Sequence, residues 1–168
     1  MKDFSPLKIG VVVIVALYFF NIVLHPTDWH FIDNINLIFH EAGHPIMMFF
    51  GEFLHAAGGT IFQIGIPAFI AFYFWKREEF FSASLILFWV GQNFINASVY
   101  AGDAIVQNLP LLGGDSVNHD WTATLSMLGI LKYTPLVADI LFYIGLLIIL
   151  AATYFSVKVS FTKANLRG

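Results

Sequence analysis

Residues 7–24 read LKIGVVVIVALYFFNIVL, an apolar run whose only charge is Lys8. A stretch of this length is typical of a transmembrane helix. It is longer than the apolar region of a signal peptide, and no small-residue cleavage site follows it. We therefore expect a retained first membrane helix.

The composition extends this expectation to the whole chain. Of the 168 residues, 58% are hydrophobic and 11% are charged, whereas a soluble domain carries about 25% charged residues. Because lipid offers no hydrogen bonds to the backbone, spanning segments of this kind must be helical. The composition predicts an all-α, polytopic membrane protein forming a single integral membrane domain over residues 1–168.

The composition gives no support for nucleic-acid binding or for cysteine chemistry. The formal net charge of -3 gives no case for a nucleic-acid partner. The chain has no cysteine, which excludes disulfides and thiolate metal ligands.

Breaks between the apolar runs predict about five membrane helices and one short amphipathic helix from about residue 119 to 131. Gly58-Gly59 is interpreted as a helix-ending turn, with close backbone approach to a substrate as the alternative. Five crossings place the termini on opposite sides, and the lysines and arginines favour a cytoplasmic C-terminus. The expected membrane helices cover about residues 7–24, 33–55, 60–75, 80–109 and 135–157.

The second of these helices contains Phe39-His40-Glu41-Ala42-Gly43-His44, an H-E-x-x-H motif. On a helix, His40 and His44 lie one turn apart on the same face, at the spacing that two ligands of one zinc ion need. Glu41 lies beside them and can take a proton from a water that the metal activates. The alternative is a chance match with two hydrogen-bonded core histidines. The cost of burying such groups in lipid favours the metal.

A catalytic zinc takes three protein ligands and leaves one position open. We expect Asp103 as the third ligand, because a carboxylate inside a membrane helix needs a partner. His119 is the second candidate and Asp120, which also suits a helix cap, is the third. If the motif helix begins at Asp33, His44 and Asp103 differ in depth by about 18 Å. A loop residue such as His119 must then fold in, and Gln92 or Asn96 faces the motif.

Gln92, Asn96 and Asp103 are spaced by four and seven residues and therefore share one helix face. Together with Gln63, the two amides are expected to donate hydrogen bonds to an oxyanion or to the substrate backbone. The alternative for Gln92 and Asn96 is hydrogen bonding between helices.

A membrane-embedded His40-Glu41-Ala42-Gly43-His44, followed by a glycine pair and a later aspartate, resembles the site-2 protease class of intramembrane zinc metalloproteases. The resemblance implies cleavage of membrane segments of other proteins within the lipid bilayer. The sequence around Asp103 differs from the pattern of that class. Asp103 lies between Gly102 and Ala104, whereas the class has a leucine-aspartate-glycine sequence. The chain also resembles a group of small, mostly bacterial membrane proteins, which implies a bacterial inner membrane. That second resemblance rests on Phe39–His44, Gly91-Gln92-Asn93, Asp103-Ala104, Leu109-Pro110, Gly113-Gly114 and His119-Asp120-Trp121.

The leading hypothesis is an intramembrane zinc metalloendopeptidase with a Zn²⁺ cofactor and Glu41 as general base. One alternative is a membrane protein that binds metal without hydrolysis, for transport, sensing or assembly. The further histidines that suggest it are His25, His30, His55 and His119. Another is a zinc hydrolase of a small amphiphile, because ester and amide hydrolysis share the same attack on a carbonyl.

Overall fold

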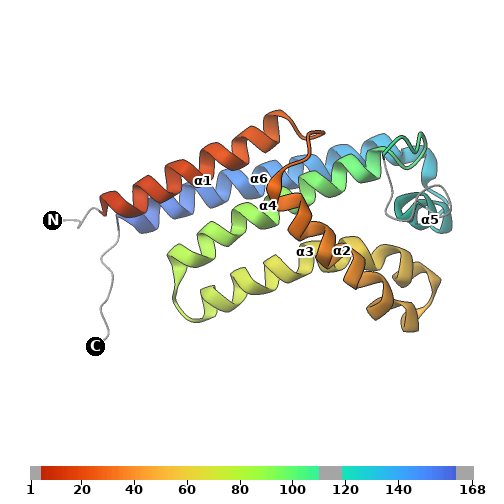
Figure 1. Ribbon diagram of the computed structural model, residues 1–168, viewed down its shortest axis with the longest axis horizontal. Coiled ribbons are helices and arrows are strands. Elements are labelled where there is room, and N and C mark those ends of the chain that lie inside the picture. The colour runs from red at the N-terminus through yellow and green to blue at the C-terminus, as the bar shows by residue number, and fades with distance from the viewer. Residues whose placement is uncertain (1–4, 110–118, 162–168) are drawn as a thin grey trace.

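The computed structural model describes residues 5–109 and 119–161, and this part of the chain is helical and without strands. The predicted all-α class is therefore confirmed for the described residues. Figure 1 shows the elements in order: α1 (Pro6–Leu24), α2 (Phe31–Met47), η1 (Met48–Phe50), α3 (Glu52–Lys76), α4 (Phe80–Gly102), α5 (Asp120–Met127), η3 (Leu131–Tyr133) and α6 (Thr134–Ser160).

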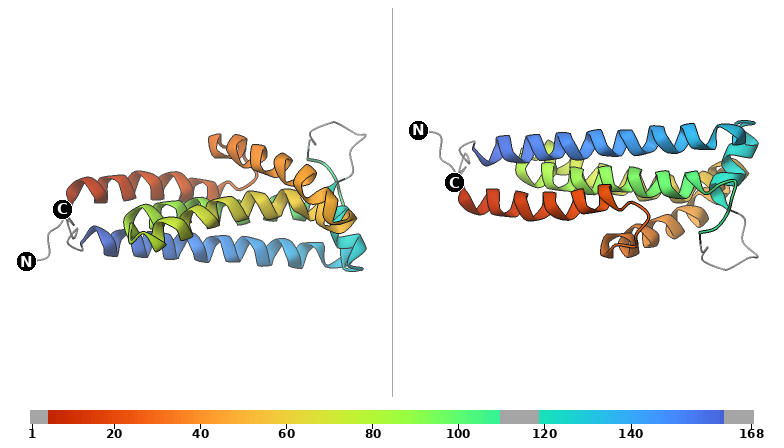
Figure 2. Two further views of the ribbon diagram at one scale, coloured as in Figure 1. Left: turned by 90° about the horizontal axis from the view of Figure 1, so that it is seen from below. Right: turned by 90° about the horizontal axis from the view of Figure 1, so that it is seen from above.

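Four segments are long and apolar enough to cross a membrane: α1, α3, α4 and the segment formed by η3 and α6. They run along the long axis of the molecule, while α2 crosses them obliquely (Figure 2). Large apolar side chains point outward along α1 and α6, for example Leu7, Ile14 and Leu147. Such exposure is expected of side chains that face lipid.

The helix that carries the motif is shorter than predicted. It ends at Met47 instead of near residue 55, and α2 is not among the four segments that could span a membrane. The chain turns at Gly51, whose φ of 100° lies in the left-handed region that glycine tolerates. Four crossings place both ends on one side, whereas five would separate them. In agreement, the Ser5 N–H donates to the Ser160 carbonyl at 3.4 Å.

Two further predicted boundaries are wrong. The glycine pair Gly58-Gly59 does not end a helix but lies inside α3. The helix predicted for residues 80–109 ends at Gly102, and Asp103 is its C-cap. A carboxylate expected inside the membrane helix therefore lies at its end.

The scaffold behind the site is the contact between α4 and α6. Its closest point is the Gly91–Gly145 pair, where a Cβ on Gly91 would lie 2.8 Å from the Gly145 carbonyl oxygen. Phe88, Ile95 and Ile149 are fully buried beside this pair and belong to the main apolar cluster. This packing holds α4 in place and leaves its polar face free to meet α2 and α3.

A second glycine contact joins α2 to α3. A Cβ on Gly43 would collide with the backbone of Gly58. A Cβ on Gly59 would lie 2.5 Å from Nε2 of His40. The glycine pair thus makes room for α2 and for the ring of the first motif histidine.

Candidate metal centre

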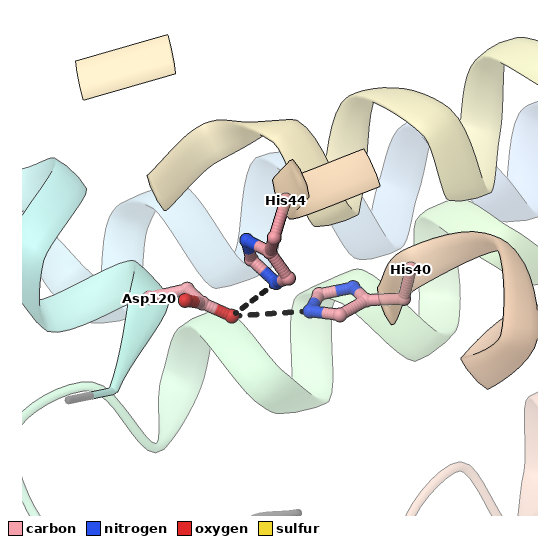
Figure 3. Close-up of side chains that lie close together, drawn as sticks. All are labelled: His40, His44 and Asp120. Atoms are coloured by element: carbon pink, nitrogen blue, oxygen red, sulfur yellow. Dashed lines mark hydrogen bonds and ion pairs between the residues drawn. The ribbon is translucent and has the colours of Figure 1, made fainter. Parts of the chain in front are cut away.

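His40, His44 and Asp120 form the one group of three histidine or acidic side chains, among residues 5–109 and 119–161, that could hold a metal ion. The histidines come from one face of α2, and Asp120 is the first residue of α5 (Figure 3). Asp120 Oδ2 lies 3.1 Å from Nε2 of His40 and 3.3 Å from Nε2 of His44. The three ligand atoms lie within 4.8 Å of one another. The geometry thus brings together the two predicted histidines and the aspartate that the sequence ranked third.

The other ring nitrogen of each histidine has its own partner. His44 Nδ1 lies 2.9 Å from the backbone carbonyl of His55, and His40 Nδ1 lies 3.0 Å from Oε1 of Gln63. A carbonyl oxygen only accepts, so each Nδ1 carries a proton and donates it. In a neutral imidazole the Nε2 atom then presents a lone pair. Two Nε2 atoms and a carboxylate oxygen converge on one point. A proton on Nε2 gives a hydrogen bond to the carboxylate, and a metal ion bound there would replace that proton. Metal-binding histidines usually have outer partners of this kind.

Asp120 is held in place from two sides. His119 is the N-cap of α5, and its Nδ1 accepts from the Thr122 N–H at 3.4 Å. The Thr122 hydroxyl in turn donates to the Ala104 carbonyl, which ties α5 to the end of α4. The Tyr100 hydroxyl donates to Asp120 Oδ2 at 3.2 Å. The carboxylate is thereby aimed at the histidines.

The Asp120 carboxyl and the ring of His44 shift each other's pKa. Burial acts to raise the pKa of the Asp120 carboxyl, but the hydrogen bonds to His40 and His44 outweigh it and hold that pKa below its ordinary value. The pKa of His44 is raised, chiefly by its hydrogen bond to Asp120, and the negative charge of Glu41 adds to the shift. Both directions mean that the negative carboxylate and a neighbouring positive charge stabilise each other.

The structure does not bring Asp103 to the histidines, which corrects the expected third ligand. Asp103 accepts from the backbone N–H groups of Asn108 and Leu109, both at 2.9 Å. His119, the second candidate, points Nε2 at Asp103 Oδ2 at 3.5 Å. The two side chains stabilise the turn after α4 and the start of α5. α2 begins at Phe31, close to Asp33, which is the case in which Asp103 was expected to lie too far away. The residue that reaches the histidines in its place is Asp120, the first residue of α5, and not His119.

Glu41 is exposed and opens onto a cavity of about 380 Å³. The cavity lies between the α1–α2 loop, α2, α3 and α4, and His40 reaches its wall. Its apolar lining comes from Pro26, Trp29, Leu37, Val99, Tyr100 and Leu109. Glu41, the expected general base, and His40 of the metal group therefore line the same cavity, which a small ligand could enter.

The three amides expected to contact substrate have protein partners. Gln63 Nε2 donates to Asn96 Oδ1 at 2.7 Å, and Gln92 Nε2 donates to Asp33 Oδ1 at 2.7 Å. Gln63 and Asn96 do line the cavity, whereas Gln92 is buried away from it. The alternative of hydrogen bonding between helices therefore describes Gln92 and Asn96.

Sequence reasoning missed three residues around this site. Asp33 and Asn36 lie seven and four residues before His40, and Tyr100 lies four residues after Asn96. The same helical periodicity that grouped Gln92 with Asn96 would have placed each of them on the inner face.

No family model, curated protein or solved structure matches the chain.

Proposed function

We propose that the chain is an intramembrane zinc metalloendopeptidase, similar in its chemistry to site-2 proteases, that cleaves membrane segments of other proteins. The convergence of His40 Nε2, His44 Nε2 and Asp120 Oδ2 beside the exposed Glu41 carries the proposal. A bacterial inner membrane is the proposed location.

Zinc suits the donor set, although two histidines and one carboxylate also suit iron(II). Two imidazole nitrogens and one carboxylate oxygen match the three protein ligands of catalytic zinc sites, which keep one position open. Magnesium and calcium prefer sets of oxygen ligands. Both outer partners, Gln63 and the His55 carbonyl, fix the tautomer in which Nε2 is available.

The protein groups then have separate tasks. His40, His44 and Asp120 hold the metal, which when bound supplies Lewis-acid polarisation of a carbonyl and activation of a water. Glu41 accepts the proton of the attacking water and delivers it to the leaving amine. Tyr100 keeps Asp120 oriented through its hydroxyl.

The cavity favours a neutral, apolar peptide segment as the substrate. Its wall is mostly apolar, and its ionisable carboxyl groups are Asp28, Asp33 and Glu41. Among the described residues of the lining, His40 is the basic side chain. The mostly apolar wall therefore suits an apolar segment of a substrate.

The extra histidines give little support to metal transport. His25 Nδ1 bonds to the Asn21 carbonyl, and His30 Nε2 bonds to the His25 carbonyl. His119 faces Asp103. Two histidines outside the motif lie near the site: the ring of His55 is 5.7 Å from the ring of His44, and the ring of His119 is 4.3 Å from that of Tyr100.

Zinc content and cleavage must be measured on the same purified protein in detergent micelles. The probe is a fluorescent peptide with one apolar transmembrane segment, and mass spectrometry in ¹⁸O-water identifies new carboxyl termini. Glu41→Gln should keep zinc and abolish cleavage, because Gln cannot accept the proton. Glu52→Gln, an exposed carboxylate in the first turn of α3, is the matched control and should cleave normally. Wild-type cleavage by Glu41→Gln would refute the proposed mechanism.

A further inference from the structure

A continuous row of hydrogen bonds leads from Trp89 to a buried carboxylate. The Trp89 indole N–H donates to Asn36 Oδ1 at 2.7 Å. Asn36 Nδ2 donates to Gln92 Oε1, and Gln92 Nε2 donates to Asp33 Oδ1, both at 2.7 Å. An indole nitrogen can only donate, so the orientation of both amides follows from Trp89. Asp33 Oδ1 is thereby an acceptor.

The row continues from Asp33 to the metal centre. Asn96 Nδ2 donates to the same Oδ1 at 3.1 Å. This turns Asn96 Oδ1 toward Gln63, whose Nε2 donates to it at 2.7 Å. Gln63 Oε1 therefore faces His40 Nδ1, at 3.0 Å. Each amide has one donor and one acceptor end. Asp33 therefore fixes the orientation of Asn96, Asn96 fixes that of Gln63, and Gln63 presents an acceptor to His40 Nδ1.

We propose that Asp33 is a positioning residue that fixes the metal-binding tautomer of His40 through Asn96 and Gln63. We call the side chains Trp89, Asn36, Gln92, Asp33, Asn96 and Gln63 the Asp33 network. The inference rests on the metal centre proposed above. Asp33 acts over two intervening side chains and does not touch the metal group.

Burial makes this orientation persistent. Asp33, Gln63 and Gln92 are between 1% and 4% exposed, and His40 is 6% exposed. Asn96, the link between Asp33 and Gln63, is half-buried and lines the cavity. Reversing any one amide would set two donors or two acceptors against each other, and an unmade buried hydrogen bond costs about 1–3 kcal/mol. Asp33 is also fixed from its own helix, because Oδ2 accepts the His30 backbone N–H at 2.7 Å.

A role limited to helix association is the competing explanation, since polar side chains often join membrane helices. Holding the helices together does not require that this row of hydrogen bonds end on Nδ1 of His40. The two roles differ in one observable, the proton on His40 Nδ1.

The test uses zinc-loaded protein with ¹⁵N-labelled histidine, and follows the ring N–H signals together with zinc affinity by chelator competition. Asp33→Leu and Asn96→Leu should each remove or shift the His40 Nδ1–H signal and lower zinc affinity about 10–100-fold, as for other outer-shell partners. The His44 Nδ1–H signal is the internal control, because its partner is the His55 carbonyl, outside the network. Ser98→Ala, at a buried α4 residue whose hydroxyl donates to the Ile95 carbonyl, should change neither signal.

Gln63→Glu supplies the rescue. A carboxylate at this position can only accept, so His40 Nδ1–H keeps a partner whatever the orientation of Asn96. The double variants Asp33→Leu/Gln63→Glu and Asn96→Leu/Gln63→Glu should therefore regain the His40 signal and most of the zinc affinity. If Asp33→Leu does not fold, the Asn96 pair carries the same test.

Unchanged His40 signals in both leucine variants would overturn the inference while leaving the zinc site intact. Loss of the His40 and His44 signals together, without rescue by Gln63→Glu, would also overturn it in favour of a general structural role. Failure of the wild-type protein to bind zinc through Nε2 would overturn this inference and the proposed function together.

Discussion

Gly59→Ala should damage the metal centre without altering any group that contacts the metal. The new Cβ would lie 2.5 Å from Nε2, 2.6 Å from Cε1 and 2.7 Å from Cδ2 of His40. Ordinary van der Waals contact begins at 3.4 Å, so the ring must move by 3.4 minus 2.5, or about 0.9 Å. Zinc sites tolerate ligand displacements of about 0.2 Å.

We expect zinc affinity to fall by at least about 10–100-fold, the range for loss of an outer-shell partner. This corresponds to about 1.4–2.8 kcal/mol, at 1.4 kcal/mol for each factor of ten. The assay is competition with a chromophoric chelator on purified protein in detergent. Gly65→Ala is the matched control, because it lies on the same helix with nothing within 4 Å of its Cβ. Gly59→Ala protein that binds zinc as tightly as Gly65→Ala would refute the inferred contact between α3 and His40.

Three further outcomes follow from the same structure. Asp120→Asn should lower zinc affinity by more than the roughly 100-fold limit for outer-shell partners, whereas Asp103→Asn should leave it unchanged; the reverse result in a chelator assay would restore Asp103 as the ligand. Val99→Trp should fill part of the cavity and slow peptide cleavage, because the indole takes the space that a substrate would need, while zinc content stays normal; equal rates would exclude the cavity as the substrate site. Gly91→Ala should lower the free energy of unfolding by about 1–3 kcal/mol, because its Cβ would lie 2.7 Å from Ile149 Cγ1; an unchanged thermal unfolding temperature would contradict the close contact of α4 and α6.

Local patterns in the sequence predicted the helices and half of the site. A long apolar run has one low-energy arrangement in lipid, which is why the segments that became α1, α3, α4 and α6 could be recognised. His40 and His44 lie one helical turn apart, and that relation depends only on the pitch of the helix. The helix ends were less predictable, because Gly51 reverses the chain with a positive φ while Gly58 and Gly59 do not.

The third carboxylate could not be read from spacing. Asp103, His119 and Asp120 are all far from His40 along the chain, and each has a chemically reasonable role as a ligand. The choice depends on which of them reaches α2, and helix packing decides that. Asp103 caps its own turn through the N–H groups of Asn108 and Leu109, so the first residue of α5 meets the histidines instead.

The sequence by itself determined the all-helical class, the presence of helices long and apolar enough to span a membrane, and the pairing of His40 with His44 on one helix face, because each follows from composition or helical periodicity. Tertiary structure alone decided that Asp120 completes the group, that Gly59 makes room for the His40 ring, and that a row of amides leads from Asp33 to Nδ1. These features join α2, α3, α4 and α5, and contacts between separate helices depend on the shapes of all the packed side chains together.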